Sequence, residues 1–181
     1  TCRRSCSLFA RAGLSIHPAV TNMSIPAAYG LVGGAVATSI VGQVLASGRV
    51  MQARKKYGVK YPTLYATVWK NDKGELVSNA EDGTAESGNA FNSAQRGHQN
   101  GLETYPGMLA ATLVGGLTHP IAAASSLLLW VIGADAYSRQ YSEGGPSNRN
   151  KGPLPLFKYV GLLSLLVINC KVAYGAALTL L

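Results

Sequence analysis

The stretch AAYGLVGGAVATSIVGQVLASG, residues 27–48, contains no charged side chain. A helix needs about 20 predominantly apolar residues to cross a hydrocarbon layer about 30 Å thick. A second uncharged stretch, which runs over residues 104–134, is longer still. Both stretches therefore indicate helices that cross a membrane.

The composition of the whole chain supports this interpretation. Of its 181 residues 48% are hydrophobic and 13% are charged, whereas a soluble domain carries about a quarter charged residues. The net charge of +8 is explained by basic residues that flank the spans, as in the cluster Arg49, Arg54, Lys55, Lys56 and Lys60. Nothing resembles a nucleic-acid-binding module. We predict an all-α integral membrane protein with no nucleic-acid partner.

Four spans are predicted, over residues 27–54, 91–117, 121–141 and 154–181. The first is rich in glycine and alanine, which lets membrane helices approach closely. Residues 61–88 are predicted to form a polar loop, with a turn at 71–75 and a solvated, flexible stretch at 81–88. Residues 142–153 form the second long connection.

We expect two parts in the chain, a tail over residues 1–24 and a four-helix membrane domain over residues 25–181. The tail is rich in arginine and serine, so it is either disordered or the remainder of an organelle-targeting segment. Cys2, Cys6 and Cys170 have neither a disulfide pattern nor the spacing of metal ligands, and no metal site is predicted.

Four spans place both long loops on the same side of the membrane. These loops and the helix ends that flank them carry most of the lysine and arginine, whereas the opposite connection has only His119. The preference of basic loops for the cytosol places the long loops there, although the three arginines of the tail argue for the other orientation.

The run FNSAQRGHQNGLETYP, residues 91–106, places Arg96, Asn100 and Glu103 on one face of a helix where an apolar span begins. Polar side chains in a membrane helix are either contacts between helices or a binding site. Arg96 and Glu103 could pair with each other, but a tight ion pair is not expected, because two turns of helix separate them. His98 lies about 200° from Arg96 around a helix of 3.6 residues per turn. It cannot reach the same pocket within one subunit.

Three more residues follow at the same membrane surface. Tyr137 and Tyr141 lie one turn apart on the third span, where they are either part of the interfacial aromatic belt or part of a site. Arg149 follows in the next loop and contacts either lipid phosphates or a ligand.

These motifs together resemble the membrane-associated eicosanoid and glutathione metabolism (MAPEG) family, and within it the type 3 microsomal glutathione S-transferases. The resemblance covers residues 25–181. It depends most on QRGHQNGLETYP (residues 95–106), with ARKKYGVKYP (53–62) and the segment 137–149 in support. The family implies a four-helix membrane subunit that assembles as a homotrimer, in the endoplasmic reticulum or, as the alternative, a mitochondrial membrane.

The resemblance also implies a cofactor and a site. Glutathione would be bound by Arg96, Asn100, Glu103, Tyr137 and Tyr141, while Arg54 and His98 would reach in from the adjacent subunit. Arginine suits the carboxylates of glutathione and Glu103 suits its ammonium.

Arg149 matches the arginine that faces the glutathione sulfur in the family's leukotriene C synthase, and a nearby cation favours the thiolate. The loop before Arg149 carries an extra residue relative to that enzyme, so Arg139 is the alternative. Two further positions differ from it, because this chain has His98 and Thr104 where the synthase has glutamine and tyrosine.

The expected activity is that of a glutathione transferase and peroxidase, which conjugates electrophilic lipids or reduces lipid hydroperoxides. Two other functions stay open from the sequence. One is a non-catalytic lipid-binding scaffold of the same family, and the other is a structural subunit of a larger membrane complex.

Overall fold

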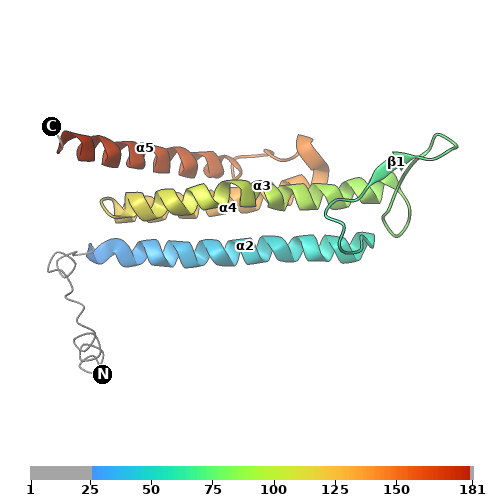
Figure 1. Ribbon diagram of the computed structural model, residues 1–181, viewed down its shortest axis with the longest axis horizontal. Helices are drawn as coiled ribbons and strands as arrows, with labels where there is room; N and C mark the ends of the chain where they lie inside the picture. Colours follow the sequence, from blue (N-terminus) through green and yellow to red (C-terminus); the bar gives the residue numbers. More distant parts are fainter. Residues whose placement is uncertain (1–25, 180–181) are drawn as a thin grey trace, which may run out of the picture.

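The computed structural model describes residues 26–179, so the predicted tail lies outside the described part of the chain. Four long helices follow one another, with a small hairpin between the first two (Figure 1). The elements are η2 (Ala27–Tyr29), α2 (Gly30–Tyr57), β1 (Val68–Lys70), β2 (Leu76–Ser78), α3 (Ala85–Gly116), α4 (Pro120–Gly144), η3 (Gly145–Ser147) and α5 (Leu156–Leu178).

The prediction of an all-α membrane fold is confirmed. Three segments are long and apolar enough to cross a membrane: Ala27–Tyr57, Pro120–Ser147 and Leu156–Leu178. The helix α3 is long enough but not apolar enough to be among them, since its first half carries the polar residues of the run 91–106. It begins at Ala85 rather than near Phe91, so it extends beyond the predicted span at the polar end.

The centre of the bundle is α4, which packs against α2, α3 and α5. Its Trp130 and Leu127 are fully buried, and the Trp130 ring stacks on Tyr105 of α3 with centroids 5.8 Å apart. Glycines bring α4 and α5 together, because a Cβ at Gly133 would lie 2.0 Å from the backbone nitrogen of Lys158. Small residues at such crossings are what lets membrane helices pack without a hydrophobic driving force.

The loop between α2 and α3 is more ordered than predicted. The turn at residues 71–75 is confirmed, and it joins two antiparallel strands in which Val68 pairs with Ser78. The prediction of a flexible stretch at 81–88 is wrong, because α3 begins inside it. Local hydrogen bonds explain the difference: the Asp82 carboxylate accepts from the backbone N–H of Thr84 and from the Ser87 hydroxyl (2.6 Å).

Thr84 caps the start of α3, and its removal has a measurable local effect. Its hydroxyl oxygen accepts from the Ser87 N–H at 3.3 Å, and loss of such a cap costs about 1 kcal/mol. We expect Thr84→Ala to speed amide hydrogen exchange in the first turn of α3, with Thr67→Ala, an exposed threonine of the same loop, as the control. Equal exchange in both variants would contradict the capping role.

Asp82 adds a pH dependence to the same helix start. Its pKa is held below the ordinary value of 3.8, first by the Ser87 hydroxyl and then by the Thr84 backbone N–H. Because the folded state lowers this pKa, the stabilisation is present above about pH 4 and is lost as the pH falls through the folded-state pKa.

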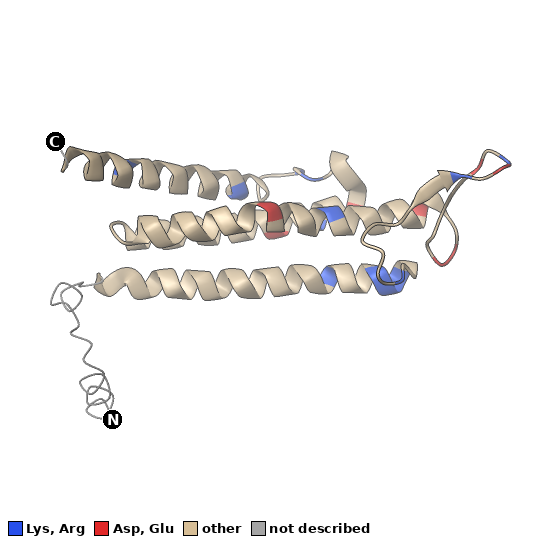
Figure 2. Cartoon of the chain, in the orientation of Figure 1, with Lys and Arg blue, Asp and Glu red and all other residues tan. Residues whose placement is uncertain are grey.

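The two long connections lie at the same end of the bundle, as predicted. The hairpin and the α4–α5 connection are at one end, and the short α3–α4 turn and the end of α5 are at the other (Figure 1). Charged residues gather at the hairpin end and over the adjoining half of the helices (Figure 2). This end therefore faces the polar membrane surface and the water beyond it. The location of the hairpin end on the cytosolic side of the membrane stays a prediction.

Candidate glutathione-binding site

Arg96 and Glu103 form an ion pair on the outer face of α3. The Arg96 Nη1 atom lies 2.6 Å from Glu103 Oε1, and both side chains are a little over 40% exposed. The prediction that these residues are too far apart for a tight pair is wrong, because the length of the arginine side chain spans the two turns. An exposed pair contributes little to stability, about 0–1 kcal/mol. A ligand can therefore replace this pair at little cost in stability.

Arg96 lines an open cleft of about 630 Å³ at the hairpin end of the bundle. A cleft of this size is within the range of small-molecule sites. Its lining comes from the loop before β1, from α3, and from the end of α4 and the connection beyond it. The lining residues are Tyr65, Asn89, Asn92, Ser93, Arg96, Gln99, Tyr141 and Pro146. Two predicted site residues, Arg96 and Tyr141, thus meet in one cleft.

Tyr137 and Asn100 continue the site towards the interior. The Tyr137 ring packs against Tyr141 with centroids 5.9 Å apart. The ammonium of Lys158, from α5, lies 4.2 Å from the centroid of the Tyr137 ring and donates a hydrogen bond to Asn100 Oδ1. Residues of three helices are therefore connected beneath the cleft.

Arg149 lies in the turn between η3 and α5, where it is exposed. The alternative, Arg139, is held elsewhere: its Nε atom donates to Asp135 at 2.7 Å, and it lies about 200° from Tyr137 around α4. Arg139 is therefore engaged with Asp135 and lies on a different face of α4 from Tyr137.

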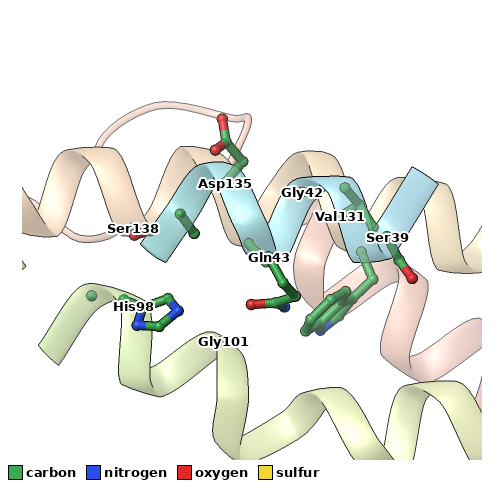
Figure 3. Close-up of a pocket in the computed structure, with 12 residues that line it drawn as sticks. Ser39, Gly42, Gln43, His98, Gly101, Val131, Asp135 and Ser138 are labelled. Atoms are coloured by element: carbon green, nitrogen blue, oxygen red, sulfur yellow. The ribbon is translucent and has the colours of Figure 1, made fainter. Parts of the chain in front are cut away.

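His98 lies on the other side of α3, as predicted. With Gln43 of α2 it points into a cavity enclosed by α2, α3 and α4 (Figure 3). The cavity has a volume of about 30 Å³, enough for one or two water molecules and far too little for a tripeptide. Beside this cavity, the Nη2 atom of Arg49 lies 2.7 Å from Asp135 Oδ1, but the two groups are not aligned for a hydrogen bond. Within one subunit, His98 does not reach the cleft of Arg96.

Arg54 is buried at the end of α2, away from the cleft. Its Nη1 atom donates to the carbonyl oxygen of Val59 at 2.9 Å, and its guanidinium lies over the rings of Tyr61 and Phe91. It also lines a separate hollow of about 370 Å³ with Lys55 and Lys60. The structure of one subunit thus separates Arg54 and His98 from the other predicted site residues.

Neither Thr104 nor Tyr105 lines the cleft of Arg96. The Thr104 hydroxyl donates to backbone carbonyls of its own helix. Tyr105 stacks on Trp130 and shares a 2.9 Å hydrogen bond with Ser39, so it belongs to the core.

The comparison with known families agrees with this geometry. The sequence model of the MAPEG family matches residues 32–170, which is most of the chain. The chain belongs to the MAPEG family. Proteins of the MAPEG family generally use glutathione as substrate or cofactor. The matched residues run from Val32 of α2 to Cys170 of α5 and include every predicted site residue.

Two residues of the candidate site were missed from the sequence. Tyr65 lies in a loop, where no periodic pattern marks it, and its hydroxyl donates to Gln99 beside Arg96. Lys158 carried a clear signal, because a lysine near the start of an apolar span is a functional hypothesis by default.

Proposed function

We propose that this protein is a glutathione-dependent transferase and peroxidase that acts on lipids within the membrane. We further propose that it works as a homotrimer in the endoplasmic reticulum membrane. Membership of the MAPEG family and the apolar helices support the class. The finer assignment rests on the chemistry of the residues around the cleft.

The ion pair of Arg96 and Glu103 is the observation that carries the proposal. One end of glutathione is an amino acid with a carboxylate and an ammonium side by side. Such a zwitterion can replace one exposed ion pair with two, since its carboxylate suits the arginine and its ammonium suits Glu103. Arg96 lines the open cleft and both side chains of the pair are exposed, so the exchange needs no rearrangement of the helices.

The remaining residues orient the ligand and select its ionisation state. Tyr141 presents its ring in the cleft, Tyr137 supports that ring, and Asn100 offers an amide. Bound glutathione supplies a thiol whose thiolate form attacks electrophilic lipids and reduces lipid hydroperoxides. Arg149 provides a cation at the mouth of the site, which favours the thiolate.

Of the two residues expected from an adjacent subunit, Arg54 is the better supported. It lines a wide hollow of about 370 Å³ at the end of α2, whereas His98 faces a cavity of only about 30 Å³ within its own subunit. Many large apolar side chains of α2 and α5 are exposed, among them Val44 and Leu45 on α2 and Leu163 and Val167 on α5. These faces suit contact with lipid or with neighbouring subunits.

Glu103→Gln tests the contact with the ammonium. We expect this variant to bind glutathione about tenfold or more weakly, because a charge-assisted hydrogen bond is lost. N-acetylated glutathione, which has no ammonium, should bind the variant and the wild-type protein alike. Isothermal titration calorimetry in detergent measures both affinities.

Glu143→Gln serves as the control, since Glu143 is an exposed carboxylate near the end of α4. It should bind both ligands as the wild-type protein does. An equal loss of affinity for glutathione and its acetylated form in Glu103→Gln would contradict the assigned role.

A further inference from the structure

Lys158 is the most deeply buried cation of the candidate site. Its residue is 4% exposed, and it lies near the start of α5 at the close crossing with α4, where its backbone faces Gly133. A buried ammonium is costly unless an opposite charge or a set of acceptors compensates it. The contacts of Lys158 should therefore show which partner it has.

The described residues give Lys158 no anionic partner in contact. Its hydrogen bond goes to the neutral amide of Asn100, and its ammonium lies over the ring of Tyr137. Glu103 is within Coulombic range, but it is in contact with Arg96 instead. An ammonium has three N–H donors, and only one of these makes a hydrogen bond within residues 26–179.

The contact with Lys158 also fixes the orientation of the Asn100 amide. Because an ammonium can only donate, the Asn100 oxygen must face Lys158, and the Asn100 nitrogen must face away. Within residues 26–179 that nitrogen donates no hydrogen bond. Asn100 is only half-buried, so a ligand can reach it. Lys158 and Asn100 together thus present several N–H donors and no free acceptor.

The charges of the site and of the proposed ligand point to the missing partner. Glutathione with its thiol ionised carries two carboxylates, one thiolate and one ammonium. The residues already assigned are Arg96 for the amino-acid carboxylate, Glu103 for the ammonium and Arg149 for the thiolate. The carboxylate of the glycine end has no cation assigned within the subunit.

We propose that Lys158 binds the glycyl carboxylate of glutathione, with the Asn100 amide as a second donor. This inference rests on the proposed function and extends it to a residue of α5. The two oxygens of a carboxylate match the donors of a lysine and an amide. Binding would supply the anion that the buried ammonium lacks.

Lys158→Met tests this with two ligands, glutathione and its glycyl ethyl ester, in calorimetry on the detergent-solubilised protein. The wild-type protein should bind glutathione about tenfold or more tightly than the ester. The variant should bind glutathione as weakly as the ester, because the cation that distinguishes them is gone. Lys158→Gln, which keeps a hydrogen bond to Asn100 without the charge, should behave like Lys158→Met.

Lys171→Met is the matched control, since Lys171 is an exposed lysine of the same helix, and it should bind both ligands as the wild-type protein does. If Lys158→Met still prefers glutathione over the ester as strongly as the wild-type protein does, the inference is wrong. A wild-type protein that binds neither ligand would overturn the proposed function, and the role of Lys158 with it. The substitution Lys158→Met should weaken the binding of S-methylglutathione as much as that of glutathione. If it weakens only the binding of glutathione, whose thiol is free, Lys158 contacts the sulfur instead.

Discussion

Arg149→Ala is expected to remove the thiolate absorbance of bound glutathione and to slow conjugation by about 100-fold. A free cysteine thiol titrates at a pH of about 8.5, and a nearby cation lowers that value. Loss of one group that stabilises developing or fixed charge in an active site costs about 10²–10³ in rate. The ultraviolet absorbance of the thiolate and the rate with an electrophilic lipid epoxide measure the two effects. Affinity for glutathione should fall much less than the rate.

Two variants control for this result. Lys151→Ala removes an exposed cation of the same turn and should leave the absorbance and the rate within about twofold, as for other exposed charges. Arg139→Ala breaks the contact with Asp135 and tests the alternative assignment. A thiolate signal that survives in Arg149→Ala and disappears in Arg139→Ala would show that the assignment of Arg149 is wrong.

Gly133→Leu is expected to destroy the packing of α4 against α5. A Cβ at this position would lie 2.0 Å from the backbone nitrogen of Lys158 and 2.7 Å from its Cα. Backbone atoms of a packed helix cannot move aside as a flexible side chain can, so the cost should reach about 3 kcal/mol or more. We expect the variant to elute as aggregate on size exclusion in detergent and to bind no glutathione.

Gly34→Leu is the control for this prediction, because nothing lies within 4 Å of the corresponding Cβ on α2. It should fold and elute as the wild-type protein does. A stable Gly133→Leu variant with unchanged elution would mean that α4 and α5 do not pack as described.

Much of the fold could be predicted from the sequence because a membrane imposes a simple rule. Uncharged stretches of sufficient length must become helices, since the backbone has no other way to satisfy its hydrogen bonds in lipid. This rule located α2, α4 and α5 within a few residues. It located the end of α3 but not its polar start, which extends to Ala85, and it did not predict the hairpin, whose strands are only three residues long.

The site was predictable to the extent that its residues share a helix face. The 3.6-residue period placed Arg96, Asn100 and Glu103 together and His98 apart, as observed. The spacing of Arg96 and Glu103 along the helix axis led to the wrong prediction for their ion pair, because the length of an arginine side chain was not considered. Contacts between helices were beyond the sequence: nothing in it says that Lys158 meets Asn100, 58 positions away.

The most direct test of the central claim is a pH titration of glutathione bound to the purified protein, followed by the ultraviolet absorbance of its thiolate. We predict that the thiolate signal appears at a pH well below the pKa of a free thiol, which is about 8.5. Saturable binding with a thiol that ionises only near that value would contradict an activated thiolate. The absence of binding would contradict the proposed function as a whole.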